Sequence, residues 1–253
     1  MSATSEHAIW DPVEALPPER LRALQLERLR GTVARVLAGQ PLGAARLAEA
    51  GVERAEDVRS LDDLSGLPFS WKDDLHEGYP FGLLAVPREQ LVRVHASSGS
   101  HGKPTVVGYT SADLDAWTEC MARCMTMAGV RPGMLVHNAN GYGLFTGGLG
   151  FHAGAERIGA TVIPVSGGFS ARQAMLLSDL GGQVLCATPS YALVIAQAIR
   201  DAGLDPAELS LELGLLGGEP WTEGMRHQLD RELGIDSISF YGLSEMCGPG
   251  VAA

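Results

Sequence analysis

The sequence predicts an α/β protein whose mostly parallel sheet is flanked by helices. From Ser111 onward, short apolar runs typical of buried strands alternate with longer runs whose apolar residues recur at helical spacing. The connections between these runs are short, which favours parallel strands joined by crossover helices. Glycine supplies 32 of the 253 residues, a content that suits many tight connections.

The predicted elements of this alternating part follow one another closely. Ser111 can cap the first helix, and Asp113 and Asp115 lie in its first turn, where carboxylates stabilise the amino end of a helix. Helices are predicted at 111–129, 147–158, 170–180, 190–202 and 222–233. Strands are predicted at 134–137, 161–165, 183–187, 211–216 and 237–241. In such a sheet, ligands bind beyond the carboxyl ends of the strands.

The preceding part is predicted to be mostly helical. Helices are expected at 17–38 and 42–50, followed by short helical segments that begin at Ser60 and Pro68. Two strands, at 90–94 and 105–109, enclose a glycine-rich turn. We therefore divide the chain into an N-terminal helical segment, 1–78, and an α/β core, 79–253.

Composition and charge exclude several classes of function. Hydrophobic residues make up 45% of the chain and charged residues 19%, as in an ordinary folded globular protein. The formal net charge of −11 argues against binding to nucleic acid or to an anionic membrane. No apolar run approaches the roughly 20 residues that cross a bilayer. The polar stretch 1–9 lacks the apolar core of a signal peptide, so we expect a cytoplasmic protein.

The glycine-rich turn Ser97-Ser98-Gly99-Ser100-His101-Gly102-Lys103 has the residue types of an anion site. Backbone N–H groups and hydroxyls in such a turn can point at a phosphate, and Lys103 adds a positive charge. The turn is not a Walker A loop, because only two residues separate Gly99 from Gly102. A polar hairpin turn is an equally weighted alternative when this stretch is taken alone.

Two further stretches follow predicted strands and carry polar side chains. In Tyr241-Gly242-Leu243-Ser244-Glu245, an aromatic ring, a glycine, a hydroxyl and a carboxylate could hold an aromatic base, a phosphate and Mg²⁺. A nucleophile elbow requires glycine at position 246, where methionine stands, so that alternative fails. In the stretch Gly217-Gly218-Glu219-Pro220-Trp221-Thr222, the glycines could allow the backbone to run close alongside a flat ligand such as adenine. An ordinary turn between strand and helix explains either stretch in isolation.

The stretch 140–148 combines two aromatic residues, Tyr142 and Phe145, with four glycines that include Gly147 and Gly148. Small residues leave room and aromatic faces line it, as an aryl-binding pocket requires, although core packing explains Phe145 equally well. The histidines at 95, 137 and 152 have no evident triad partner and are interpreted as structural. Cys120 and Cys124 lie four residues apart on a predicted helix. Because no further metal ligand is near them, helix packing is favoured over a metal site.

Together and in this order, these motifs resemble the AMP-forming (adenylating) enzyme superfamily, and within it the phenylacetate–CoA ligases. The resemblance runs from about Trp10 to the C-terminus. The stretches that carry it are 79–83, 86–90, 93–109, 142–150, 154–157, 188–191, 219–222 and 241–252. It implies an α/β fold, the large N-terminal domain of an adenylate-forming enzyme, truncated before the C-terminal domain.

The resemblance also implies a two-step reaction with small-molecule partners. ATP and an aryl acid such as phenylacetate would give an acyl-adenylate and pyrophosphate, after which the thiol of coenzyme A would displace AMP. The expected cofactors are ATP, Mg²⁺ and coenzyme A as a substrate.

The resemblance assigns roles residue by residue. The phosphate loop comprises Ser97, Ser98, Gly99, Ser100, Gly102 and Lys103. Gly218, Glu219 and Pro220 belong to the adenine segment, and Tyr241 packs on the base. Gly242 and Ser244 approach the α-phosphate, and Glu245 is the metal ligand. Lys103, Ser244 and Glu245 form the catalytic set. Tyr142, Phe145, Gly147 and Gly148 are assigned to the aryl pocket.

Some positions depart from the family pattern. His101 stands where the family has a threonine, Ser239 where an Asp or Asn commonly contacts the adenine amine, and Asn140 where the aryl pocket commonly has a tyrosine. The family continues beyond the Tyr241 motif into a second half with a catalytic lysine, so the chain looks like an N-terminal fragment that is weakly active or inactive alone. The alternative is a non-catalytic nucleotide- or acyl-binding module, or half of a split enzyme. A homodimer is compatible with either.

Overall fold

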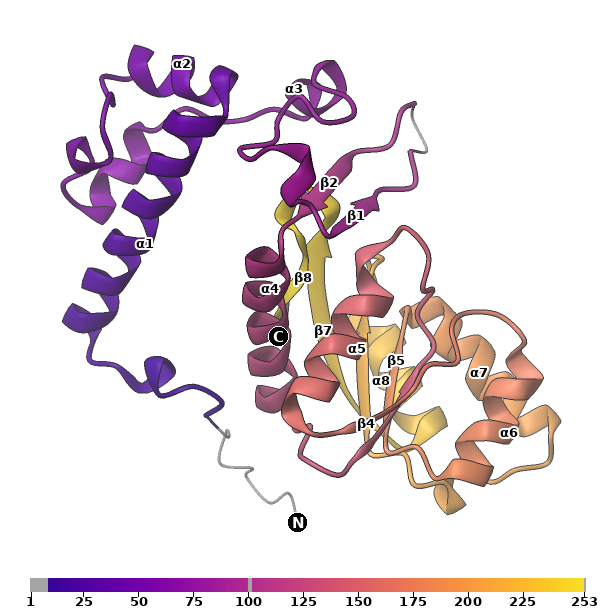
Figure 1. The fold of residues 1–253 in the computed structure, drawn as a ribbon. Helices are drawn as coiled ribbons and strands as arrows, with labels where there is room; N and C mark the ends of the chain where they lie inside the picture. Colours follow the sequence, from indigo (N-terminus) through magenta and orange to yellow (C-terminus); the bar gives the residue numbers. More distant parts are fainter. Residues whose placement is uncertain (1–8, 100–101, 253) are drawn as a thin grey trace. The chain divides into compact units, whose positions relative to one another are not determined.

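The computed structural model describes residues 9–99 and 102–252, and the chain forms two compact units. One unit comprises Asp11–Ser111, and the other contains Trp10 and the chain from Ala112 onward. Each is described by itself (Figure 1). The division predicted at 78/79 separates segments by their expected roles and stays a prediction, whereas compactness divides the chain at Ser111.

The unit Asp11–Ser111 begins with helices. They are η1 (Pro12–Ala15), α1 (Pro18–Gly39), α2 (Pro41–Glu49), η2 (Ala55–Asp57), η3 (Leu61–Gly66), α3 (Lys72–Glu77) and η4 (Arg88–Gln90). A small core of Val33, Leu47, Val52 and Val58 holds α1 and α2 against the following loops. The helices predicted at 17–38 and 42–50 are confirmed to within one residue at each end.

An antiparallel hairpin completes this unit. Strands β1 (Arg93–Ala96) and β2 (Val106–Tyr109) pair with Arg93 opposite Tyr109 and Ala96 opposite Val106. The register brings the ends of the glycine-rich turn together. The second strand agrees with the prediction of 105–109, whereas the first begins and ends later than the predicted 90–94, because Gln90 belongs to η4.

The second unit contains the larger sheet. Its strands are β3 (Leu135–Asn138), β4 (Thr161–Ile163), β5 (Val184–Ala187), β6 (Leu213–Gly217), β7 (Asp236–Leu243) and β8 (Gly248–Ala252). Their order is β4-β3-β5-β6-β7-β8, and all neighbours are parallel except the antiparallel pair β7 and β8. The mostly parallel sheet is therefore confirmed, but β8 was not predicted. Its Gly-Pro-Gly start does not read as a strand, and proline is tolerated here because β8 lies at the sheet edge.

Helices cover both faces of this sheet (Figure 1). They are α4 (Ser111–Met127), α5 (Thr146–Ile158), α6 (Ser170–Leu180), α7 (Pro189–Asp201) and α8 (Glu223–Leu233), with η5 (Pro206–Glu208) and η6 (Ser244–Met246) in the connections. A core cluster joins α6, α7 and α8 to Leu185 and Leu216. On the other face, Phe151 of α5 packs against Phe240 of β7 with ring centroids 5.0 Å apart.

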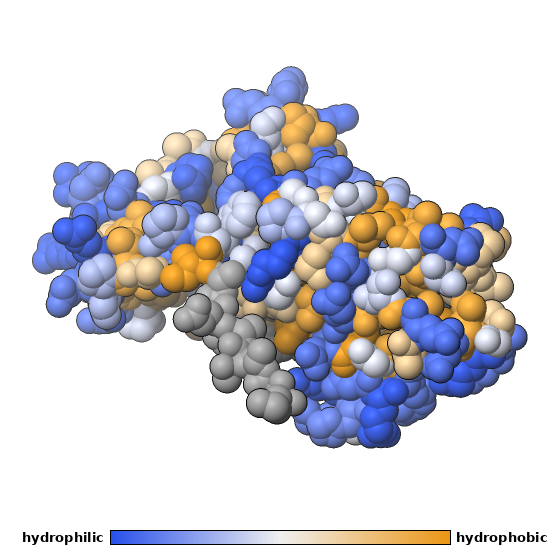
Figure 2. All heavy atoms as spheres, turned by 90° about the horizontal axis from the view of Figure 1, so that it is seen from below, coloured by the Kyte–Doolittle hydropathy of each residue, from blue (hydrophilic) through white to orange (hydrophobic). Residues whose placement is uncertain are grey.

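The surface seen in Figure 2 mixes hydrophilic residues with small hydrophobic groups. Exposed hydrophobic residues on α6 and α7 include Met175, Leu180 and Val194. Among residues 9–99 and 102–252, no helix has both the length and the apolar character that a membrane crossing requires.

Candidate nucleotide site

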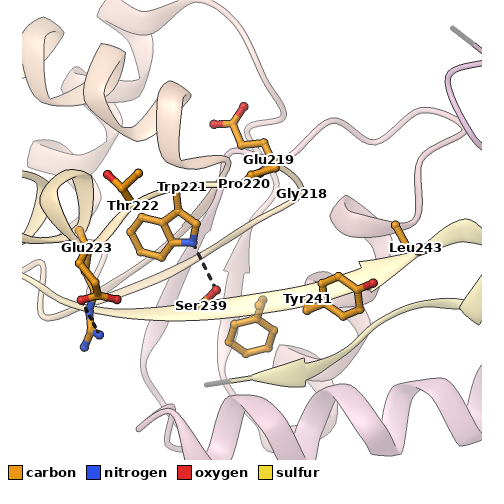
Figure 3. A pocket seen from close by; sticks show the side chains of 12 residues that line it. Gly218, Glu219, Pro220, Trp221, Thr222, Glu223, Ser239, Tyr241 and Leu243 are labelled. Carbon is orange, nitrogen blue, oxygen red and sulfur yellow. Dashed lines mark hydrogen bonds and ion pairs between the residues drawn. The ribbon is translucent and has the colours of Figure 1, made fainter.

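A cavity of about 680 Å³ lies in the second unit, at the carboxyl ends of β6 and β7. Figure 3 shows its lining side chains, which come from the β6–α8 loop, the first turn of α8 and the end of β7. The lining residues are Gly218, Glu219, Pro220, Trp221, Thr222, Glu223, Arg226, Ser239, Phe240, Tyr241, Gly242 and Leu243. The structure thus brings five of the predicted site residues, Gly218, Glu219, Pro220, Tyr241 and Gly242, to one cavity.

Glycines allow the β6–α8 loop to run close beside β7. A methyl group at Gly217 would collide with the carbonyl oxygen of Phe240. Gly218 has a φ of 89°, in the left-handed region that favours glycine. Thr222 then caps α8, because its side chain accepts a hydrogen bond from the N–H of Met225 at 3.2 Å. Loop and helix start are therefore fixed by local sequence.

Aromatic residues form walls of the cavity. Ser239 and Tyr241 alternate with Phe240 along β7, so the buried Phe240 ring faces α5 while Ser239 faces the cavity. The indole N–H of Trp221 donates to Ser239 Oγ at 3.2 Å, which fixes Trp221 across the strand (Figure 3). The Tyr241 side chain is 55% exposed, which leaves a ring face for a flat ligand.

The cavity also has charged side chains at its rim. Glu219 Oε1 accepts a hydrogen bond from the backbone N–H of Ser190 at 2.6 Å, in the first turn of α7. Arg226 lies 3.6 Å from Glu223 as an ion pair. Arg226 was not among the predicted site residues. The sequence could have indicated Arg226, because it comes one helical turn after Thr222 and therefore lies on the same side of α8 as the β6–α8 loop.

The predicted metal ligand lies at the tip of a hairpin formed by β7, η6 and β8. Gly242 pairs with Pro249 and Leu243 with Gly248, and a side chain at Gly242 would collide with the Pro249 backbone. Ser244 is half-buried and Glu245 is exposed. The hairpin therefore presents a hydroxyl and a carboxylate beyond the sheet.

The predicted aryl residues do not line this cavity. Tyr142 instead belongs to a chain of polar contacts. Its hydroxyl oxygen accepts from Asn138 Nδ2 at 2.8 Å and lies 3.1 Å from His152 Nδ1, while His152 Nε2 lies 3.1 Å from Glu156 Oε1. Burial raises the pKa of Tyr142 to about 12.

The other residues of this segment differ in environment. Phe145 is 54% exposed and immediately precedes α5, whereas Gly148 is buried. A side chain at Gly148 would collide with the carbonyl oxygen of Gly141, while Gly147 has only distant neighbours. Gly148 is therefore required by packing, and Gly147 leaves open space.

The predicted phosphate loop belongs to the unit Asp11–Ser111. Its ends are joined because Ser97 N donates to Thr105 O, and Thr105 N donates to Ser97 Oγ, each at 2.9 Å. Gly99 and Gly102 have φ values of 66° and 138°, which favour glycine. Lys103 Nζ lies 4.9 Å from the centre of the Tyr79 ring. Ser98 is exposed, and Ser100, with His101, lies outside the described residues.

The histidine and cysteine side chains described next make contacts within the packed interior of the fold. His95 is buried, and its ring lies edge-on to that of Tyr109. His137 is also buried, its Nε2 lies 2.5 Å from Gln173 Oε1, and burial lowers the pKa of His137. The thiol of Cys124 donates to Gly250 O at 3.0 Å, in agreement with a packing role. Within the described part of the chain, no group of three or more His, Cys, Asp or Glu residues could hold a metal ion.

Comparisons with known proteins show which enzymes the chain is similar to. No protein-family model matches the chain. The phenylacetate–coenzyme A ligase of Thermus thermophilus is 56% identical over 240 residues, which is 95% of this chain and 54% of the relative. That of Escherichia coli is 49% identical over 243 residues, 96% of this chain and 55% of the relative. The chain spans about half the length of these curated relatives.

A solved structure of an acyl-CoA ligase is similar in fold to the chain. The 2-hydroxyisobutyryl-CoA ligase, in complex with 2-HIB-AMP and CoA in the thioesterification state, superposes with a TM-score of 0.90 at 28% identity. The match covers 100% of this chain and 55% of that one. Over the half of their length that it spans, the chain is similar in sequence to phenylacetate–coenzyme A ligases and similar in fold to a solved acyl-CoA ligase of the adenylate-forming enzymes.

Proposed function

We propose that the chain is the nucleotide- and acid-binding part of an AMP-forming acid–CoA ligase that acts on phenylacetate or a close aryl acid. The observation that carries this proposal is the cavity between the β6–α8 loop and the end of β7, which joins the adenine segment to the Tyr241 motif. The relatives at about half identity, named phenylacetate–coenzyme A ligases, suggest the acid.

Adenine would lie between the β6–α8 loop and the Tyr241 ring. Gly218 borders the cavity and has no side chain, so it leaves room for a flat base beside the loop. Ser239 Oγ already accepts the Trp221 N–H, so its own hydroxyl hydrogen can be donated to a ring nitrogen of the base. This contact differs from that of the Asp or Asn common at position 239, which contacts the adenine amine.

The carboxylate at the tip of the β7–β8 hairpin could bind a Mg²⁺ ion that enters together with ATP. Mg²⁺ binds through one or two carboxylates together with phosphate oxygens and water, and it needs no cage of protein ligands. The exposed carboxylate of Glu245 at the hairpin tip suits this role. When bound, the ion would neutralise charge on the phosphates. By the resemblance alone, Lys103 belongs to the phosphate loop and would add a positive charge that stabilises the phosphates.

The chemistry then follows in two steps. A carboxylate oxygen of the acid attacks the α-phosphorus of ATP, and pyrophosphate leaves. The coenzyme A thiolate next attacks the acyl carbon, and AMP leaves with the bonding electron pair. Gly242 and Ser244 would contact the α-phosphate, while Tyr142, Phe145, Gly147 and Gly148 would surround the aryl group of the acid.

Two measurements on the 253-residue chain test this proposal. Calorimetric titration with AMP and with a phenylacetyl sulfamoyl-adenosine, a stable mimic of the acyl-adenylate, measures binding. Phenylacetate-dependent exchange of labelled pyrophosphate into ATP measures the first chemical step. Binding of both ligands supports the proposed site, and exchange in addition would show that this part alone performs the first step. Binding without exchange is the result expected both of a ligase part without the catalytic lysine and of a non-catalytic module. If the chain binds neither AMP nor the phenylacetyl sulfamoyl-adenosine, the proposal is overturned.

A further inference from the structure

We propose that Trp117 of α4 is a positioning residue for the hairpin that carries Tyr241, Ser244 and Glu245. The inference rests on the proposed function for its effect on ligands. Its structural basis is independent of that function, because the contacts lie entirely within the second unit. Figure 1 shows α4 beside β8.

The central contact is a buried hydrogen bond between residues 132 positions apart in the sequence. Trp117 Nε1 donates to the carbonyl oxygen of Pro249 at 2.7 Å, and the Trp117 side chain is buried with 7% relative exposure. Pro249 is paired with Gly242 in the hairpin. The indole therefore acts on the strand directly opposite the Tyr241 motif.

Two glycines form the slot that receives the indole. A methyl group at Gly150 of α5 would lie 2.7 Å from Trp117 Cζ2, and one at Gly248 of β8 would lie 2.6 Å from the same atom. Both distances are shorter than a normal contact between carbon atoms. Gly248 also has a φ of 101°, so a larger residue there would be strained. The indole ring therefore packs closely against Gly150 and Gly248, and neither glycine could carry a side chain without displacing it.

The edge position of β8 explains why such a contact is needed. β8 is the last strand in the sheet order and hydrogen bonds to β7, and Pro249 has no N–H to donate. A second contact comes from the same helix, because the thiol of Cys124 donates to Gly250 O at 3.0 Å. Trp117 and Cys124 are two helical turns apart and lie on one face of α4. That face supplies two donors to consecutive residues of the edge strand.

The same indole links the hairpin to the segment proposed to bind the acid. Gly150 belongs to α5, which follows directly after Phe145. A methyl group at Gly248 would also lie 3.0 Å from Thr146 Cβ, so the start of α5 meets β8. A shift of Trp117 would move the hairpin and the start of α5 relative to each other.

Hydrogen exchange measured by mass spectrometry tests the positioning role without a ligand. Trp117→Phe keeps a buried ring and removes the N–H donor. We expect the backbone amides of 241–250 to exchange roughly tenfold faster, as the loss of about one buried hydrogen bond predicts. Incorporation of 3-benzothienylalanine at position 117 is a closer replacement, because sulfur takes the place of the N–H group. It secures the test if the phenylalanine variant fails to fold.

Leu177→Val in α6 provides the matched control, since Leu177 is fully buried in the core that joins α6, α7 and α8. It should lower the melting temperature while exchange at 241–250 stays near that of the wild type. Equal acceleration in the control, or no acceleration in the position-117 variants, would overturn the positioning role.

Ligand binding provides the functional measurement. The position-117 variants should bind the phenylacetyl sulfamoyl-adenosine about tenfold more weakly, and Leu177→Val should bind it as the wild type does. Unchanged affinity in the position-117 variants, with exchange accelerated, would overturn the link to function. If the wild-type chain binds no adenylate mimic, the proposed function fails, and the exchange measurement alone decides whether Trp117 positions the hairpin.

Discussion

The carboxylate of Glu219 lies 2.6 Å from the backbone nitrogen of Ser190 and so caps α7 from a different element of the fold. The interaction satisfies one of the N–H groups that a helix leaves unpaired in its first turn, and the negative charge suits the positive end of the helix dipole. It also fixes the β6–α8 loop, which borders the cavity, against α7.

Removal of this cap should destabilise the protein. Glu219→Ala is expected to cost about 1 kcal/mol, which corresponds to roughly 2–4 °C in melting temperature for a chain of this size. Glu219→Gln keeps an oxygen acceptor and should cost less. Thermal unfolding followed by circular dichroism measures both. Glu208→Ala, at an exposed position in η5, is the control and should change the melting temperature little. An equal effect of the control would contradict a capping role.

The Trp221–Ser239 hydrogen bond should contribute to the affinity for adenine nucleotides. Trp221→Phe removes the donor and frees the hydroxyl to rotate, so we expect AMP to bind several-fold to tenfold more weakly, in line with one hydrogen bond. Ser239→Ala should have an effect of similar size. Because the two residues act through one contact, the double variant should lose less than the sum of the single losses. Calorimetric titration with AMP measures the cycle, and strict additivity would argue against a shared role.

Glu245 should determine the response of nucleotide binding to Mg²⁺. The wild-type chain is expected to bind ATP more tightly when Mg²⁺ is added, and Glu245→Gln should lose most of this gain because the amide is a poorer ligand. Affinity for AMP without metal should stay unchanged. Glu208→Gln serves as the control for the lost charge. If Glu245→Gln retains the full gain with Mg²⁺, Glu245 is not the metal ligand.

The Arg46–Asp74 pair should make the unit Asp11–Ser111 sensitive to acid. Arg46 donates two hydrogen bonds to the Asp74 carboxylate, at 2.6 and 2.7 Å, and holds the pKa of Asp74 at about 2 instead of 3.8. The folded state therefore binds this proton less readily than the unfolded chain does. The stabilisation is present above about pH 4 and is lost as the pH falls toward 2.

Urea unfolding at a series of pH values tests whether the free energy of unfolding falls as the pH is lowered. Asp74→Asn should lower the free energy of unfolding at neutral pH and flatten its dependence on pH between about 4 and 2. Asp73→Asn, at the exposed neighbouring position, is the matched control and should keep the wild-type slope. A wild-type slope in Asp74→Asn would show that another group causes the acid sensitivity.

Local sequence was sufficient to predict much of the fold. The glycines at 159, 181 and 234 cap the carboxyl ends of their helices in the left-handed conformation, so those helices end close to where the pattern predicts. The strand–helix alternation likewise predicts parallel strands, because crossover connections permit little else. Strand β8 escaped prediction because its pairing depends on β7 and α4, not on its own composition.

For the cavity, sequence patterns were sufficient to predict the lining residues Gly218 to Pro220, Tyr241 and Gly242, because glycine and aromatic residues that follow strands indicate a ligand site locally. The roles of Ser244 and Glu245 stay predictions. Only the tertiary structure decided that Trp221 donates to Ser239, that Glu219 caps α7 and that Trp117 supports Pro249. These contacts join residues 18, 29 and 132 positions apart. Their geometry depends on how the helices pack on the sheet, which no local pattern encodes.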